Sequence, residues 1–174
     1  VKTSTGFAAT GAVAEDVGLI NNPTTEGSAV QMGIGQGDML VTPLQVVDFI
    51  AAIGNGGILY RPQIIESVTD IEGNIIESFA PQVRGTLPVS KETLEALQTG
   101  MRMVVHDPKG TAYKAFWGMQ TPVYGKTGSA TTSVEDPHGW FAGYTALGSA
   151  EKPDIAIVVI AENSGDGSVY AAPI

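Results

Sequence analysis

The stretch VYGKTGSATTS, from Val123 to Ser133, holds a Gly-Lys-Thr triplet that two unrelated chemistries use. In a phosphate-binding loop, the triplet ends a glycine-rich turn, and a helix begins directly after it. In an acyl-transfer site, lysine and threonine lie on an extended strand that faces the substrate. The residues around the triplet distinguish these two interpretations.

The phosphate-loop interpretation fails on spacing. The loop requires a glycine at position 120, where this chain has Gln120. Pro122 has no N–H group to donate to a phosphate oxygen at the point where such groups should converge. The stretch after the triplet, Ser129 to Ser133, is rich in β-branched and hydroxyl-bearing residues and does not resemble the start of a helix. We therefore expect no nucleotide site here.

A strand that carries Lys-Thr-Gly suits the recognition of a peptide terminus. An extended backbone offers N–H and C=O groups that pair with a peptide lying beside it. Lysine supplies positive charge and threonine a hydroxyl donor for a terminal carboxylate, while glycine lets the substrate backbone approach closely. The triplet alone is equally typical of a solvent-facing lysine on an ordinary edge strand, so the interpretation depends on the rest of the chain.

Composition limits the classes of function. The chain has 174 residues with 43% hydrophobic residues, enough for one domain with a buried core. Its formal charge of -9 argues against nucleic acid, because phosphate binding needs clustered Lys and Arg. The chain has no Cys and two His, so we expect no metal site and no other cofactor. The apolar run Ile155 to Ala161 is too short to span a bilayer.

Helices precede a group of strands in the predicted order of elements, which favours an α+β fold with an antiparallel sheet packed against helices. Residues 1–37 read as loops with short elements. Thr42 and Gln45 form a capping box for a helix that ends at Gly54 to Gly57, and a second helix begins near Ser90 with Leu94, Leu97, Met101 and Val104 or Val105 on one face. Predicted strands cover 64–69, 75–79, 123–130, 139–147 and 155–162.

Three further stretches resemble the class B penicillin-binding proteins, in the order that this family has them. They are GIGQGDMLVTPLQVVDFIAAIGNGGILYRPQII from Gly33 to Ile65, GTAYKAFW from Gly110 to Trp117, and DPHGWFAGYT from Asp136 to Thr145. The second resembles a short helix before the lysine strand, and the third resembles the strand after it. The resemblance covers most of the chain from about Gly33 onward.

The resemblance implies the penicillin-binding or transpeptidase fold and acyl transfer from D-Ala-D-Ala stem peptides of peptidoglycan, with penicillin binding at the same site. It assigns catalytic roles to Lys126, as positive charge near the serine and the substrate carboxylate, and to Ser129, whose N–H would be half of the oxyanion hole. Thr127 would bind the substrate carboxylate, and Gly128 would leave the strand unobstructed. No cofactor is implied.

We expect structural roles for two aromatic residues and for both histidines. Trp140 and Phe141 are expected to pack beneath the site as core aromatics. His138 is expected to be a strand-edge residue, and His106 to end a helix, where a charged imidazole interacts favourably with the helix dipole. None of the four is expected to act on substrate.

The family's nucleophile lies in a Ser-x-x-Lys motif upstream of the lysine strand, with Ser-x-Asn between them. The chain has no Ser-x-Asn, and its one Ser-x-x-Lys, Ser149 to Lys152, follows the strand. Pro153 biases Lys152 away from a helix, so we interpret this stretch as a hairpin loop. We expect residues 1–174 to be the C-terminal part of one transpeptidase domain, inactive without the missing N-terminal part.

Two other functions stay open at this point. A serine β-lactamase or a β-lactam sensor has similar strands, and a non-catalytic scaffold domain could keep the fold without the serine. The expected partners are the missing part of the domain, the stem peptide and β-lactams, with no nucleic acid. By resemblance alone, the protein would lie at the extracytoplasmic face of the cell membrane, held through an upstream anchor that this chain lacks.

Overall fold

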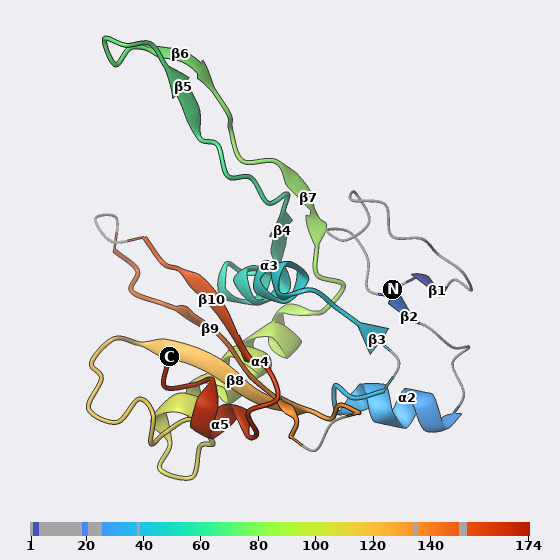
Figure 1. Ribbon diagram of the computed structural model, residues 1–174. Coiled ribbons are helices and arrows are strands. Elements are labelled where there is room, and N and C mark those ends of the chain that lie inside the picture. The colour runs from blue at the N-terminus through green and yellow to red at the C-terminus, as the bar shows by residue number, and fades with distance from the viewer. Residues whose placement is uncertain (1, 4–18, 21–25, 38, 134–135, 150–152) are drawn as a thin grey trace.

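A computed structural model describes all residues except 1, 4–18, 21–25, 38, 134–135 and 150–152 (Figure 1). The helices and strands follow in chain order: β1 (Lys2–Thr3), β2 (Leu19–Ile20), α2 (Glu26–Gly33), β3 (Met39–Leu40), α3 (Pro43–Gly54), β4 (Ile58–Tyr60), β5 (Ser67–Thr69), β6 (Ile75–Ser78), β7 (Val83–Thr86), α4 (Lys91–His106), β8 (Val123–Ala130), β9 (His138–Thr145), β10 (Ala156–Ala161) and α5 (Gly167–Tyr170).

The main sheet has the strand order β10-β9-β8, and both pairings are antiparallel, as the short connections predict. Strand β8 has the predicted bounds, whereas β9 ends two residues earlier than predicted. The reason is local: Leu147 donates its N–H to the carboxylate of Asp154 over 2.6 Å, and this bond turns the chain out of the sheet. Strand β10 is one residue shorter than predicted at each end.

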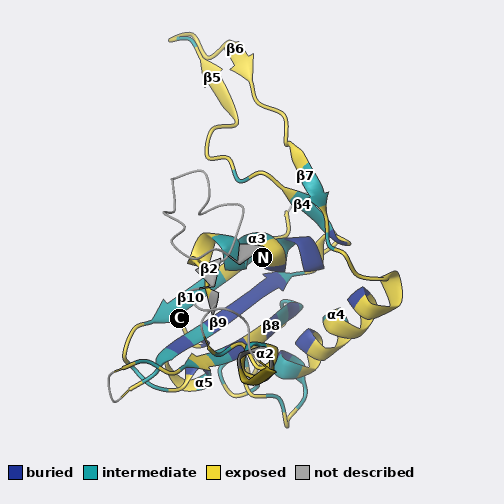
Figure 2. Cartoon of the chain, turned by 90° about the vertical axis from the view of Figure 1, so that its right-hand side faces the viewer, coloured by how far each residue is buried: buried dark blue, intermediate teal, exposed yellow. Residues whose placement is uncertain are grey.

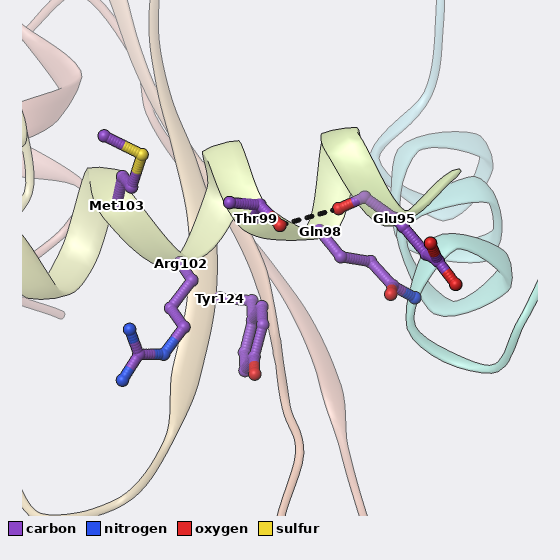
Figure 3. A pocket seen from close by; sticks show the side chains of 6 residues that line it. All are labelled: Glu95, Gln98, Thr99, Arg102, Met103 and Tyr124. Carbon is purple, nitrogen blue, oxygen red and sulfur yellow. Dashed lines mark hydrogen bonds between the residues drawn. The ribbon is translucent and has the colours of Figure 1, made fainter. Parts of the chain in front are cut away.

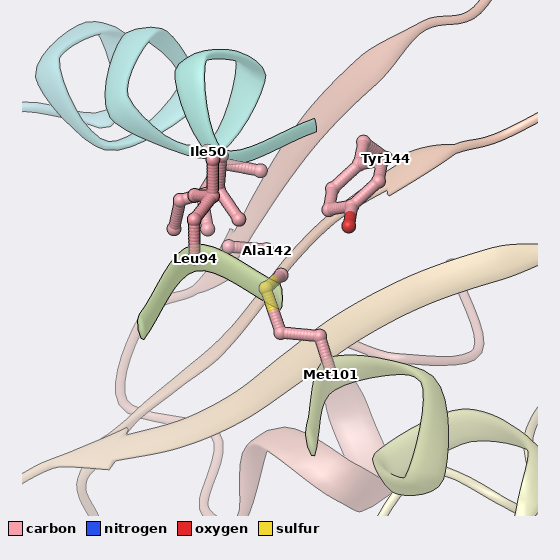
Figure 4. Close-up of a cluster of buried hydrophobic side chains, with 6 residues drawn as sticks. Ile50, Leu94, Met101, Ala142 and Tyr144 are labelled. Carbon is pink, nitrogen blue, oxygen red and sulfur yellow. The ribbon is translucent and has the colours of Figure 1, made fainter. Parts of the chain in front are cut away.

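Both faces of this sheet are covered, and α4 contributes to each, with Leu94 and Met101 on one side and Val105 on the other. Even-numbered residues of β8 and β9 face α3 and α4, where Ile50, Leu94, Met101, Ala142 and Tyr144 form part of one buried cluster (Figure 4). Odd-numbered residues face the opposite side, where a second cluster contains Val105, Ala112, Val123, Phe141, Ala171 and Ala172. The main sheet therefore lies between helical layers, which confirms the predicted α+β fold.

Helix α3 begins as the sequence predicts. The Thr42 hydroxyl accepts from the Gln45 N–H over 3.2 Å, and the Gln45 side chain accepts from the Thr42 N–H over 2.8 Å. The left-handed stop lies at Gly56 and Gly57, which have φ of 93° and 102°, while Asn55 keeps a negative φ.

Helix α4 also begins at its predicted cap, since the Ser90 hydroxyl accepts from the Thr93 N–H over 3.2 Å. Leu94, Met101 and Val105 are buried, as predicted. Leu97 was predicted on the same face, but its side chain is 43% exposed. At 100° per residue Leu97 is turned 60° from Leu94, which is enough to leave the narrow contact with the sheet.

The segment from Gly110 to Trp117 is not the predicted helix. It forms consecutive turns, with one helical bond from the Phe116 N–H to the Ala112 carbonyl over 3.3 Å. The Ala112 N–H donates instead to Val104 O at the end of α4 over 3.0 Å, so the segment folds back onto that helix. This contact holds Ala112 in the second buried cluster.

A long arm projects from this body (Figure 1). Strands β4 and β7 pair at its base, and β5 and β6 form the predicted hairpin at its tip. Most of the tip is exposed (Figure 2), and β5 begins at Ser67, not at the predicted Ile64. Ile64 is fully exposed, so its apolar side chain has no packing partner to hold it in a strand.

Strands β4 and β7 and helix α5 were not predicted. Strands β4 and β7 are three and four residues long, and α5 is a single turn of four residues. Such short elements leave little periodic signal in a sequence. None of the helices among the described residues combines the length and apolar character that a membrane span needs.

Candidate functional site

The hydrogen bonds of β9 determine which backbone groups of β8 face the open edge of the sheet. Thr145 donates its N–H to Ile155 O over 2.9 Å, toward β10. Bond directions alternate along an antiparallel strand, so the even-numbered residues of β9 bond to β8, and the register places them opposite even-numbered residues there. Thr127 and Ser129 therefore direct N–H and C=O toward the edge of β8 that no other described strand covers.

Lys126 brings a positive charge to this edge. Its side chain leaves the sheet on the α3 and α4 face and is exposed. The ammonium then curls back, and Nζ donates to the carbonyl oxygen of Thr127 over 2.6 Å. Because that carbonyl points toward the open edge, the ammonium lies beside the backbone groups that an incoming peptide would meet.

Thr127 lies on the opposite face and is buried, with 8% of its surface exposed. Its hydroxyl lies 2.7 Å from the hydroxyl of Thr111, close enough for a strong hydrogen bond in which either oxygen could donate. Thr111 is exposed and comes from the turns before β8. The pair therefore links a buried strand residue to a hydroxyl at the surface, and the partner fixes the rotamer of Thr127.

Gly128 is not required by packing within the described part of the chain. A Cβ added there would lie 3.4 Å from the Trp140 Cβ, an ordinary van der Waals distance. Trp140 was predicted to be a core aromatic, but it is half-buried on the same face as Gly128. Phe141 is 3% exposed and confirms its predicted place in the core. The two neighbours differ because alternate strand residues face opposite sides, and the α5 side is the covered one here.

Ser129 is held on two sides while its N–H faces the open edge. Its Oγ accepts a hydrogen bond from the Gly167 N–H at the start of α5 over 3.3 Å. Its carbonyl oxygen accepts from the side-chain Nε2 of Gln36 over 2.8 Å. A backbone N–H that is anchored on both sides and directed at an open edge is a suitable donor for an oxyanion.

The two histidines lie away from these groups in structural positions. His138 begins β9, and its Nδ1 accepts from the Asn163 N–H over 2.9 Å. His106 is the last residue of α4, as predicted, and its Nε2 is buried with no hydrogen-bond partner among the described residues. Of the Ser149 to Lys152 stretch, residues 150–152 lie outside the described residues, but it falls between β9 and β10 as the loop interpretation predicts.

A pocket with a volume of about 390 Å³ lies beside the start of β8. Its lining comes from one side of α4 and from β8: Glu95, Gln98, Thr99, Arg102, Met103 and Tyr124 (Figure 3). Tyr124 stacks on Tyr144, with ring centroids 5.0 Å apart. Tyr124 and Lys126 are both even-numbered, so this hollow lies on the same face of the sheet as the lysine.

Sequence reasoning missed three contacts of the site residues: those from Thr111, Gln36 and Gly167. Both Thr111 and Gln36 lie within stretches that resemble the family, but nothing in a single sequence shows which of their residues touch β8. The need for a glycine at position 167 is visible only in the folded structure, where a Cβ on Gly167 would lie 2.2 Å from Gly128 O. Such contacts depend on residues far apart in the chain.

An antiparallel sheet between helical layers, with a Lys-Thr-Gly strand at its open edge, is typical of the penicillin-recognising fold. The chain matches the penicillin binding protein transpeptidase domain over residues 5–174, and it belongs to that family. The predicted resemblance to class B penicillin-binding proteins is thereby confirmed.

The relatives of the chain agree with this assignment. It is 31% identical over 169 residues to the peptidoglycan D,D-transpeptidase MrdA of Haemophilus influenzae, covering 87% of this chain and 25% of that protein. It is 33% identical over 164 residues to the peptidoglycan D,D-transpeptidase PbpA of Mycolicibacterium smegmatis, covering 87% of this chain and 31% of that protein. The chain thus spans about a quarter to a third of their length.

A solved structure gives the same result. The imipenem acyl-enzyme complex of penicillin-binding protein A from M. tuberculosis superposes with a TM-score of 0.65 at 27% identity, covering 82% of this chain and 31% of that one. The fold of the described residues is therefore a partial transpeptidase fold.

Proposed function

We propose that the protein containing this chain is a peptidoglycan D,D-transpeptidase that also binds β-lactams. The observation that carries the proposal is the open edge of β8, where the Lys126 ammonium lies at Thr127 O and the Ser129 N–H points outward along the same edge. The relatives named as D,D-transpeptidases and the imipenem acyl-enzyme of a related protein support it.

The reaction would be acyl transfer in two steps. A serine hydroxyl attacks the carbonyl carbon of the penultimate D-Ala, the C–N bond to the terminal D-Ala breaks, and that residue leaves as an amine after taking a proton. The amine of a neighbouring stem peptide then attacks the serine ester, the C–O bond breaks, and the serine regains its proton. The serine would belong to a part of the domain outside these 174 residues.

The residues of β8 would act on the substrate without forming a bond to it. Lys126 would attract the terminal carboxylate, and Thr127 would hold it through its hydroxyl, with Thr111 as the partner in the same pair. The space beside Gly128 would admit the peptide backbone. The Ser129 N–H would donate to the developing oxyanion, a contact worth roughly 3–4 kcal/mol in enzymes where such a donor was removed.

The missing N-terminal part of the domain would be the first partner of this chain. It would bring the serine to the open edge of β8. The whole protein would act at the outer face of the cell membrane, held by an anchor outside these 174 residues.

A fluorescent penicillin tests the function. The full-length protein should form a stable covalent adduct that unlabelled penicillin prevents, and the isolated 174-residue chain should form none. A Lys126→Met variant of the full-length protein should label much more slowly. Rapid release of the label from the full-length protein would favour a β-lactamase instead, and failure to label would favour a non-catalytic scaffold.

A further inference from the structure

Gln36 lies in a turn that directs its side chain toward β8. The turn follows α2, and the Gln36 N–H donates to Gln31 O over 3.0 Å. The neighbours Gly35 and Gly37 have φ of 76° and 96°, which side-chain-bearing residues rarely adopt. A Cβ on Gly37 would also lie 3.2 Å from the Gln31 Cβ. The two glycines therefore allow a tight turn with one amide-bearing side chain at its centre.

The Gln36 amide bonds to β8 as a strand residue would. Its Nε2 donates to Ser129 O over 2.8 Å, and its Oε1 accepts from the Thr131 N–H over 3.3 Å. A residue of a parallel strand makes the same two bonds, donating to one residue and accepting from the residue two further along. The orientation of the amide is unambiguous, because a carbonyl oxygen only accepts and a peptide N–H only donates. A weaker contact of 3.4 Å joins Nε2 to the Thr131 hydroxyl.

These bonds close the open edge of β8 immediately beyond the candidate oxyanion donor. Thr127 and Ser129 present their N–H groups to the open edge, whereas the backbone from Ser129 O to the Thr131 N–H is already paired with Gln36. The Gln36 contact and the Gly167 contact to Ser129 Oγ approach the same residue from different elements. A rotation of the backbone at Ser129 would break at least one of these two bonds.

We propose that Gln36 is a positioning residue for acyl transfer. It holds the backbone that follows Ser129, so the Ser129 N–H keeps its direction toward the developing oxyanion. It also ends the stretch of β8 edge that is free to pair with the donor peptide. Gln36 contacts no reacting atom, and it acts through Ser129. This inference rests on the proposed transpeptidase function.

The test measures acylation of the full-length protein by a fluorescent penicillin in rapid-mixing experiments, which separate the dissociation constant from the acylation rate at saturation. Gln36→Ala removes both bonds. Gln36→Glu keeps the size of the side chain and the acceptor for Thr131 but replaces the donor to Ser129 O with an oxygen. Gln63→Ala is the matched control, because its Nε2 bonds to Phe79 O over 3.2 Å on the arm, far from β8 in the chain.

Both Gln36 variants should lower the saturating acylation rate by about tenfold to a hundredfold, with a smaller change in the dissociation constant, since misplaced donors act on the transition state. Hydrogen exchange at the Thr131 amide should quicken in Gln36→Ala. The Gln63→Ala control should acylate like the wild type. If Gln36→Ala does not fold, Gln36→Glu carries the same comparison.

Two results would overturn the inference. One is acylation of a folded Gln36→Glu variant within about twofold of the wild type, less than loss of a well-placed group costs. The other is that the Gln36 variants lose thermal stability and that their dissociation constant and their acylation rate change by the same factor. If instead the wild-type protein never forms an adduct, the proposed function itself fails, so the two failures are distinguishable.

Discussion

The hydroxyls of Thr111 and Thr127 lie 2.7 Å apart, although one is exposed in a turn and the other is buried on β8. A hydroxyl has one hydrogen, so this pair leaves one of the two hydrogens free to bond with a third group. The pair therefore connects the buried hydroxyl of β8 to a hydroxyl at the surface through one hydrogen bond.

Thr111→Val should slow acylation of the full-length protein by fluorescent penicillin by up to about tenfold, since a hydrogen bond between neutral groups contributes roughly 0.5–1.5 kcal/mol. Valine keeps the shape of threonine and removes the oxygen that fixes the Thr127 hydroxyl. Thr111→Ser should retain most of the rate. Thr69→Val, on the exposed strand β5, is the control. Equal rates for all three variants would exclude a role for the pair.

Replacement of Ser129 separates its side chain from its N–H. Ser129→Ala should keep most of the acylation rate, since the N–H remains and the lost contact is a 3.3 Å bond from the Gly167 N–H. Ser129→Pro should lower the rate by about a hundredfold to a thousandfold, as removal of an oxyanion donor does. Proline is tolerated at a strand edge whose N–H faces outward, so circular dichroism should show a folded protein. A fast Ser129→Pro variant would contradict the assignment.

Tyr144 should make stability depend on alkaline pH. Burial, reinforced by the nearby Tyr124, raises the pKa of the Tyr144 phenol from 10.0 to about 12. The unfolded chain therefore loses this proton first, and the contribution is full below pH 10 and is lost between pH 10 and about 12. In urea unfolding of the full-length protein, Tyr144→Phe should lose less stability than the wild type between pH 9 and pH 11.

The same variant should be at least as stable as the wild type at neutral pH. The Tyr144 hydroxyl is buried and has no hydrogen-bond partner among the described residues, a cost of roughly 1–3 kcal/mol that phenylalanine removes. Tyr60→Phe, at an exposed residue of β4, is the control and should change neither quantity. A destabilised Tyr144→Phe protein would reveal a partner for this hydroxyl.

Gly125→Ala should destabilise the domain by about 1–3 kcal/mol, the usual cost of overpacking. A Cβ on Gly125 would lie 2.5 Å from the Phe141 Cζ, and both residues lie within the sheet. Gly100→Ala is the matched control, because nothing lies within 4 Å of a Cβ there. That change, in the interior of α4, should stabilise by about 0.5–1 kcal/mol. Chemical denaturation of the full-length variants compares the two, and equal stabilities would refute the steric argument.

Local signals predicted much of this fold. The capping box of Thr42 and Gln45 and the cap at Ser90 are both confirmed, as are the bounds of β8. Each depends on a few neighbouring residues, whose hydrogen bonds and backbone preferences act over short distances along the chain. The Lys-Thr-Gly strand and its order relative to the next two strands could be predicted for the same reason.

The contacts around the candidate site could not be predicted from local sequence. Gln36 meets Ser129 across 93 positions of the chain, and Thr111 meets Thr127 across 16. The burial of Leu97 and Trp140 was misjudged because each depends on where a helix or a second layer covers a face. Sequence alone determined the elements and the chemistry they carry, since both follow from local residue types. Only the tertiary structure decided which groups meet at the edge of β8, because packing between distant segments sets those contacts.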